Sequence, residues 1–206
     1  MKRIAVLISG SGSDLQSVID RVAAGGIDGK IEVVISSNAQ AFGLERAKRA
    51  GIDTRVYAKS EFSSLEKMYA DMIGFLRARG VELVVLAGYM SILTPNIVQA
   101  FPNAILNIHP ALIPSFCGKG YYGLKVHEAA LAYGVKLSGC TVHFVNEEAD
   151  GGPIILQESV AVLDDDTPES LQKRILEVEH RLLPDAVALF CADRLEVEGR
   201  RVRIRK

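Results

Sequence analysis

Short apolar runs alternate with amphipathic segments along the first half of the chain. An almost wholly apolar run such as Glu82–Ala87 is typical of a strand in the middle of a parallel sheet, where both faces are covered. Between such runs, apolar residues recur at helical spacing, as Leu15, Val18, Ile19 and Val22 do, and this spacing predicts helices. Strands that alternate with helices across short loops predict an α/β fold with a mostly parallel sheet and helices on both faces.

The predicted elements follow one another closely. The predicted strands are Arg3–Ile8, Ile31–Ser36, Thr54–Tyr57, Glu82–Ala87 and a run from Ala104 that stops at Pro110. The predicted helices are Asp14–Ala24, Ala41–Ala50, Ser63–Arg79, Thr94–Ala100, a segment that includes Glu128–Tyr133, and Thr167–Ala192. Thr167 is the expected N-cap of the last helix, because Pro168 and Glu169 favour the first helical turn.

The C-terminal part departs from this alternation. Lys136–Val145 and Ile154–Val162 predict two longer strands that run antiparallel across the turn at Gly151-Gly152-Pro153, and residues 195–204 predict a closing hairpin. No repeat, low-complexity segment or linker divides the chain. Residues 1–206 are therefore expected to form a single Rossmann-like domain with an antiparallel C-terminal portion.

Composition limits the classes of function. The chain carries 24 Lys and Arg against 25 Asp and Glu and has no Trp, which argues against a nucleic-acid-binding surface. No apolar run approaches the length of a membrane span. The three cysteines are widely spaced and predict neither a disulfide framework nor a metal site, and His127 and His143 lack ligand spacing with Cys or acids. We therefore expect a cytoplasmic protein that needs no metal.

An amide and an imidazole stand two residues apart in Ala104–Pro114. Residues i and i+2 of a strand point to the same side, so Asn107 and His109 are expected to face one cavity at the end of their strand. A group that titrates near neutral pH beside a hydrogen-bonding amide favours a reaction site. The alternative is a core histidine with both ring nitrogens satisfied.

The loop Gly10-Ser11-Gly12-Ser13-Asp14 lies between the first strand and the first helix. Glycines allow close backbone approach, and free N–H groups at a helix N-terminus bind anions such as phosphate. The loop lacks the third glycine of the dinucleotide fingerprint and the lysine of a Walker A loop. The alternative is a tight turn in which Ser13 or Asp14 caps the helix.

Two further motifs contain acids. Asp150-Gly151-Gly152-Pro153 is first of all a turn signature. If this turn faces His109, Asp150 would stabilise a charged imidazole. Glu179-His180 falls in the last predicted helix and, taken alone, is interpreted as part of a solvated helical face.

Together these motifs resemble the phosphoribosylglycinamide formyltransferase family of purine biosynthesis. The Asn-x-His-Pro and Asp-Gly-Gly-Pro elements are shared with all folate-dependent formyltransferases, whereas the Gly-Ser-Gly-Ser loop and the Glu-His pair are narrower. The matching stretches follow the family's order and are Ile8–Ser13, Ala41–Ala47, Leu86–Met90, Leu106–Pro110, Val142–Val145, Asp150–Pro153 and Glu179–His180.

The resemblance implies transfer of a formyl group from 10-formyltetrahydrofolate, as co-substrate, to the amine of 5-phosphoribosylglycinamide. The residues implied to bind the phosphate and ribose are Gly10, Ser11, Gly12, Ser13, Asp14 and Glu179. Those implied to bind folate are Met90, Ser91, Ile92, Leu93, Asn107, Val145 and Asp150. Residues 1–103 would then form the phosphate-binding half, and residues 104–206 the catalytic and folate-binding half.

The resemblance also implies that Asn107, His109 and Asp150 are catalytic. Amine attack on the formyl carbon builds negative charge on oxygen, to which the Asn107 amide can donate a hydrogen bond. His109, held charged by Asp150, can shuttle a proton from the amine to the departing folate nitrogen.

The chain departs from the family in three places. Many members carry Arg where this chain has Ser91, and many carry another near Leu65. The segment Ser115–Gly123 is longer than the common form, and its glycines and tyrosines predict a flexible flap from which Lys119 approaches the phosphate.

Related functions stay open. Formyltetrahydrofolate deformylase carries an N-terminal regulatory domain, whereas the first strand here begins at Arg3. Methionyl-tRNA formyltransferase carries a C-terminal RNA-binding domain and a basic surface, and neither is evident. A non-catalytic nucleotide-binding homologue would not need Asn107, His109 and Asp150. We expect small-molecule substrates, no nucleic-acid or membrane partner, and a monomer or homodimer.

Overall fold

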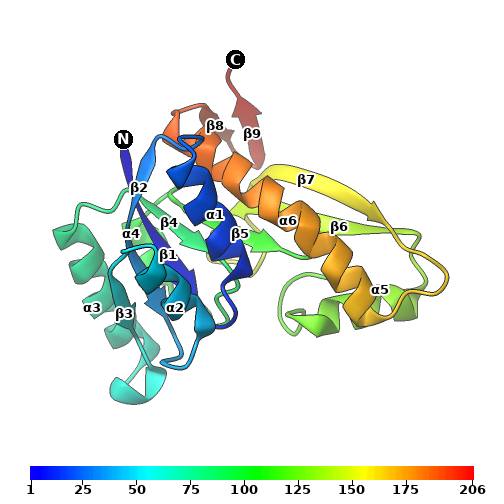
Figure 1. Ribbon diagram of the computed structural model, residues 1–206, viewed down its shortest axis with the longest axis horizontal. Helices are drawn as coiled ribbons and strands as arrows, with labels where there is room; N and C mark the ends of the chain where they lie inside the picture. Colours follow the sequence, from blue (N-terminus) through cyan, green and yellow to red (C-terminus); the bar gives the residue numbers. More distant parts are fainter.

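A computed structural model describes all 206 residues and contains one nine-stranded sheet in the order β3-β2-β1-β4-β5-β6-β7-β9-β8 (Figure 1). The strands are β1 (Lys2–Ile8), β2 (Gly29–Ser36), β3 (Thr54–Val56), β4 (Leu83–Leu86), β5 (Ile105–His109), β6 (Leu137–Phe144), β7 (Ile154–Ala161), β8 (Leu195–Glu198) and β9 (Arg201–Ile204). All predicted strands are present.

The helices also match the predicted order. They are α1 (Ser13–Ala23), α2 (Phe42–Arg49), α3 (Leu65–Ala78), α4 (Pro95–Ala100), α5 (Leu124–Tyr133) and α6 (Pro168–Cys191), with a 3-10 turn η1 (Lys59–Glu61) that the pattern did not predict. Most element ends lie within two residues of the prediction. The N-cap of α6 is Thr167, as predicted, and its hydroxyl accepts a hydrogen bond from the backbone N–H of Ser170.

The sheet is parallel from β3 through β5, and its C-terminal portion is mainly antiparallel, which confirms the predicted fold class. The neighbours of β1 are β2 on one side and β4 on the other. The connections that follow β1 and β4 therefore lead to helices on opposite faces, and ligands of open α/β sheets bind at such a switch point.

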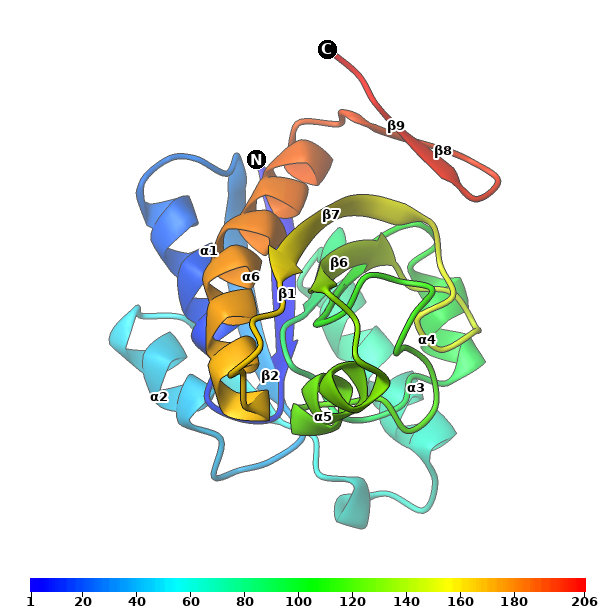
Figure 2. The ribbon, with the colours of Figure 1, turned by 90° about the vertical axis from the view of Figure 1, so that its right-hand side faces the viewer.

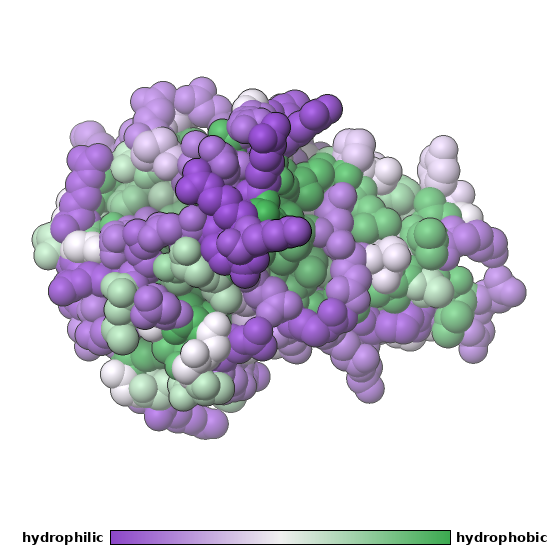
Figure 3. All heavy atoms as spheres, turned by 90° about the horizontal axis from the view of Figure 1, so that it is seen from above, coloured by the Kyte–Doolittle hydropathy of each residue, from purple (hydrophilic) through white to green (hydrophobic).

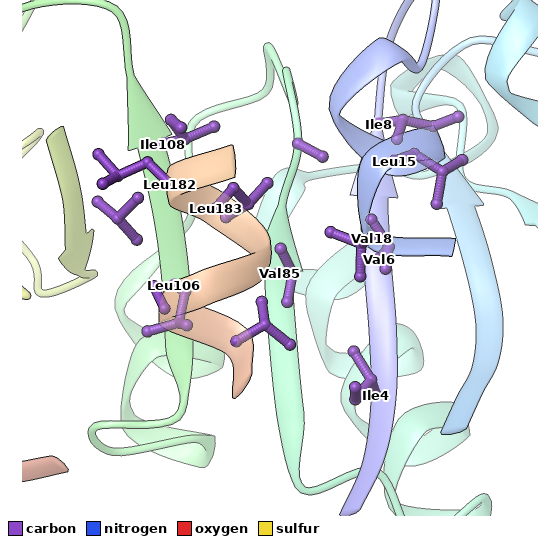
Figure 4. Close-up of a cluster of buried hydrophobic side chains, with 14 of the residues drawn as sticks. Ile4, Val6, Ile8, Leu15, Val18, Val85, Leu106, Ile108, Leu182 and Leu183 are labelled. Carbon is purple, nitrogen blue, oxygen red and sulfur yellow. The ribbon is translucent and has the colours of Figure 1, made fainter. Parts of the chain in front are cut away.

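Helices α1, α2 and α6 cover one face of the sheet, and α3 and α4 cover the other (Figure 2). Alternate residues of each central strand point into the two cores. Leu106 and Ile108 of β5 belong to the core beneath α1 and α6, together with Leu182 and Leu183 of α6 (Figure 4). Each such buried side chain contributes about 1.5–3 kcal/mol. Because this packing uses alternate residues of β5, the residues between them face the other side.

The hairpin β8–β9 extends the sheet beyond β7 and projects from the body of the molecule (Figure 2). Seen from the side on which the C-terminus lies, much of the surface is hydrophilic, with apolar residues showing between the polar ones (Figure 3).

Candidate active site

The C-terminal ends of β1, β4 and β5 lie at one edge of the sheet, because these strands are parallel neighbours. The glycine loop follows β1, the segment 87–94 follows β4, and the segment 110–123 follows β5. Three stretches selected from the sequence therefore meet next to the β1–β4 switch point.

Asn107 and His109 lie on the same face of β5, as predicted, and Asp150 contacts both. Asn107 Nδ2 donates to Asp150 Oδ1 at 3.4 Å, and His109 Nδ1 lies 3.5 Å from Asp150 Oδ2. His109 is buried, and both of its nitrogens face protein atoms, as they would in a core histidine. The convergence of an amide, an imidazole and a carboxylate at the end of β5 is what distinguishes this cluster from ordinary core packing.

The segment 115–123 covers the His109–Asp150 pair through its main chain. The Phe116 carbonyl oxygen lies 2.8 Å from His109 Nε2, and the Gly118 N–H donates to Asp150 Oδ2 at 2.8 Å. Phe116 has a φ of 49°, which is uncommon for a residue with a bulky side chain. Lys119 is exposed on this segment. The segment predicted to be a flap is thus hydrogen-bonded to two of the three predicted catalytic residues.

Burial and charge act in opposite directions in this cluster. Burial lowers the pKa of His109 below its usual value, and the nearby Asp150 charge compensates only in part. Burial alone would raise the pKa of Asp150, but the neighbouring His143 side chain, the charge of His109 and the Gly118 amide together lower it. At neutral pH Asp150 is therefore ionised and His109 is mainly neutral. The prediction that Asp150 keeps His109 charged differs from this result, because desolvation penalises the charged ring.

The turn that carries Asp150 passes close to the end of β6, the strand that precedes it. Asp150 itself has a φ of 53°, in the left-handed region. A Cβ at Gly152 would lie 1.7 Å from the backbone oxygen of Phe144, so only glycine fits there. The predicted turn is present, and it faces His109 as the functional interpretation of this motif required.

The glycine loop leaves the N-terminus of α1 free of any side-chain cap. Gly12 is the N-cap, with a φ of 70° that favours glycine. The alternative in which Ser13 or Asp14 caps the helix is therefore wrong, because both residues lie inside the first turn. A Cβ at Gly12 would lie 2.6 Å from the Cα of Gly43, and a Cβ at Gly43 would lie 2.4 Å from Ile8 Cδ1, so close packing of the loop on α2 favours glycine at both positions. The unpaired N–H groups of α1 are available to an anion.

Asp14 and Glu179 form a buried acidic pair between α1 and α6. Glu179 is only 5% exposed, so the interpretation of Glu179-His180 as a solvated helical face is wrong. Burial raises the pKa of Asp14 to about 6, with the nearby His180 acting in the opposite direction. Burial and the charge of Asp14 raise the pKa of Glu179 well above its usual value. His180 Nε2 lies 3.8 Å from Asp14 Oδ1.

The segment after β4 presents apolar side chains to solvent. Met90 is 53% exposed and Ile92 is 74% exposed. The Met90 N–H donates to Ser9 Oγ at 2.9 Å, which ties this segment to the residue that precedes the glycine loop. Ser91, Leu93 and Val145 are half-buried. Exposed apolar side chains gathered beside polar groups mark a surface that can bind a ligand.

Three residues of the site were not selected from the sequence for this role. His143 stands directly opposite Asn107 in the β5–β6 register, and its Nε2 lies 3.1 Å from Asn107 Nδ2. In the sequence, only its place in the Val142–Val145 motif pointed to a role for His143. Phe116 and Gly118 act through backbone atoms, which no side-chain pattern reveals.

No group of three or more His, Cys, Asp or Glu side chains is placed to hold a metal ion. All three cysteines are free. None of the helices combines the length and the apolar character needed to cross a membrane.

Comparisons with known proteins agree with this geometry. The model of the family described as formyl transferase matches residues 2–187. A phosphoribosylglycinamide formyltransferase from Haemophilus influenzae is 45% identical over 199 residues, which cover 96% of this chain and 91% of that protein. The solved structure of glycinamide ribonucleotide transformylase 1 from Symbiobacterium toebii has a TM-score of 0.95 and 50% identity and covers 100% of this chain and 95% of its own.

A formyltetrahydrofolate deformylase from Pseudomonas syringae is a more distant structural relative. Its TM-score is 0.89 at 28% identity, and the match covers 100% of this chain and 66% of that one. The chain therefore belongs to the formyl transferase family, among the phosphoribosylglycinamide formyltransferases.

Proposed function

We propose that this chain transfers the formyl group of 10-formyltetrahydrofolate to the amine of 5-phosphoribosylglycinamide, a step of purine biosynthesis. The observation that carries the proposal is the convergence of Asn107, His109 and Asp150 at the end of β5. The relatives that bear this activity in their names match nearly the whole chain.

The reaction forms a carbon–nitrogen bond to the glycinamide amine and breaks the bond between the formyl carbon and folate N10. One proton leaves the amine and one reaches N10. Negative charge develops on the formyl oxygen, and in this proposal the Asn107 amide, whose Nδ2 lies 3.4 Å from Asp150 Oδ1, is the donor that stabilises it. One such donor contributes about 10²–10³ in rate.

His109 is the group proposed to carry the proton. Its lowered pKa makes it mainly neutral, so it can accept a proton from the attacking amine. The ionised Asp150 then stabilises the charged ring until the proton passes to N10. For Nε2 to accept the proton of the amine, its hydrogen bond to the Phe116 carbonyl has to break and the segment 115–123 has to shift. The ring hydrogen then has to reside on Nδ1, which faces Asp150, so that Nε2 holds the lone pair.

The remaining predicted residues supply the substrate sites in this proposal. The phosphate binds at the free N-terminus of α1, formed by Gly10–Asp14, and the ribose approaches Glu179. The pterin lies against Met90–Leu93 and Val145, where exposed apolar side chains would be covered by the ring. We further propose a cytoplasmic enzyme that acts as a monomer or homodimer.

A formyl-transfer assay with both substrates tests this function. Formation of formylglycinamide ribonucleotide together with tetrahydrofolate is the expected result. Release of formate from 10-formyltetrahydrofolate without the amine would instead favour a deformylase, in line with the more distant relative. Binding of the nucleotide without turnover would indicate a non-catalytic homologue.

A further inference from the structure

A second histidine, His143, lies beside the proposed catalytic groups. It stands on β6 directly opposite Asn107 of β5 and is only 1% exposed. Directly opposite residues of antiparallel strands hold their Cβ atoms about 4.5–5.5 Å apart, so their side chains touch. The formyl transfer described above does not use His143.

The hydrogen bonds of His143 define its tautomer. Its Nδ1 lies 2.8 Å from the backbone oxygen of Phe144, and a carbonyl oxygen can only accept, so Nδ1 carries the hydrogen. In a neutral ring Nε2 then holds a lone pair and can only accept. Nε2 lies 3.1 Å from the end of the Asn107 side chain and 3.7 Å from Asp150 Oδ1, so only the Asn107 contact is within hydrogen-bond reach. The atom that faces it must be a donor, and this is the amide nitrogen.

This contact decides which way the Asn107 amide faces. One of the two hydrogens on Nδ2 is directed to His143. The other points toward Asp150 Oδ1 at 3.4 Å, longer than a normal hydrogen bond. A flipped amide would set its oxygen against both the lone pair of His143 and the carboxylate of Asp150, and both contacts would be repulsive. The second hydrogen is thus weakly held and available to a substrate oxygen.

We propose that His143 is a positioning residue for formyl transfer, whose Nε2 lone pair fixes the Asn107 amide so that one N–H faces the formyl oxygen. This inference rests on the proposed function, because it needs Asn107 to act as the oxyanion donor. Losing the correctly oriented amide removes that donor as surely as deleting the side chain does. The expected cost is therefore that of a missing oxyanion donor, about 10²–10³ in kcat.

Two substitutions of His143 distinguish the role of the Nε2 acceptor from that of the Nδ1 donor. Glutamine can place its side-chain oxygen near the position of Nε2 and keep an acceptor for Asn107. Asparagine reaches only the position of Nδ1, keeps a donor for the Phe144 carbonyl and loses the acceptor. We expect His143→Asn to lower kcat about 10²-fold with little change in the KM for the nucleotide, and His143→Gln to keep most of kcat. Equal losses in both variants, or a loss confined to KM, would overturn the proposal.

A double-mutant cycle with Asn107→Ala distinguishes positioning from packing. If His143 acts through Asn107, then His143→Asn lowers kcat of the Asn107→Ala enzyme by no more than about twofold, the accuracy to which independent effects add. A full further loss in that background would assign His143 a packing role and refute the inference alone. An unchanged kcat in Asn107→Ala by itself would contradict the oxyanion role on which the proposed function and the inference both depend.

One measurement on the unmodified chain does not depend on the folding of any variant. In ¹⁵N NMR of protein labelled on the histidine ring nitrogens, we expect His143 at neutral pH to carry a hydrogen on Nδ1 and none on Nε2. A proton on Nε2 would remove the acceptor for Asn107 and overturn the proposal.

Discussion

Replacing Gly152 with alanine perturbs the site through the backbone. The added Cβ would lie 1.7 Å from the Phe144 oxygen and 2.7 Å from the Phe144 carbonyl carbon, whereas real Cβ atoms essentially never approach a neighbour within 3.0 Å. The carbonyl or the turn must therefore move, and this carbonyl accepts the hydrogen bond of His143. The same turn carries Asp150. A displacement of about 1 Å in a catalytic constellation costs about 10²-fold in rate, so we expect kcat/KM to fall about 10²-fold.

Gly151→Ala is the matched control. The three atoms nearest to its Cβ would all belong to the side chain of Glu148, which is exposed and can turn away. We expect this variant to stay close to the unmodified enzyme in a steady-state formyl-transfer assay, with circular dichroism to verify that both variants are folded. A folded Gly152→Ala enzyme with unchanged kcat/KM would show that the turn does not hold the site in place.

Three further outcomes follow from the same structure. His109→Ala and Asp150→Asn should each lower kcat by about 10²–10⁴ while calorimetry shows nearly unchanged nucleotide binding; near-normal turnover in either would remove that residue from the mechanism. Asp14 has a folded-state pKa of about 6, above its unfolded value, so its contribution to stability is fully present at low pH and is lost as the pH rises through 6. Asp14→Asn should thus have a higher free energy of unfolding than the unmodified chain at pH 7–8, by up to about 3 kcal/mol, and unfold at a higher temperature, with the difference vanishing near pH 4; a difference independent of pH would contradict this. Thr167→Ala should lower the free energy of unfolding in urea by about 0.5–2 kcal/mol, and no change would mean that the cap of α6 is dispensable.

The alternation of strands and helices was predictable because each central strand is covered on both faces and each helix buries one stripe. Leu106 and Ile108 face one core while Asn107 and His109 face the other side, as the period of two requires. The N-cap at Thr167 followed from purely local chemistry. These features depend on neighbours in sequence, so the sequence alone could reveal them.

The features that were missed depend on contacts between distant segments. Gly12, the N-cap of α1, packs closely against Gly43 of α2. Glu179 is buried because α6 packs against α1, which no helical pattern of α6 alone shows. The role of His143 depends on the β5–β6 register, which fixes its partner. The lowered pKa of His109 reflects burial beneath a segment whose path the sequence does not specify.

The most direct test of the account is transfer of a labelled formyl group. The chain is mixed with 10-[¹³C]formyltetrahydrofolate, with and without 5-phosphoribosylglycinamide, and the label is followed by NMR. We predict that the label moves to the glycinamide amine only when the nucleotide is present and that His109→Ala slows the transfer by about 10²–10⁴. Label released as formate regardless of the nucleotide, or label that stays on folate in the presence of the amine, would contradict formyl transfer by this site.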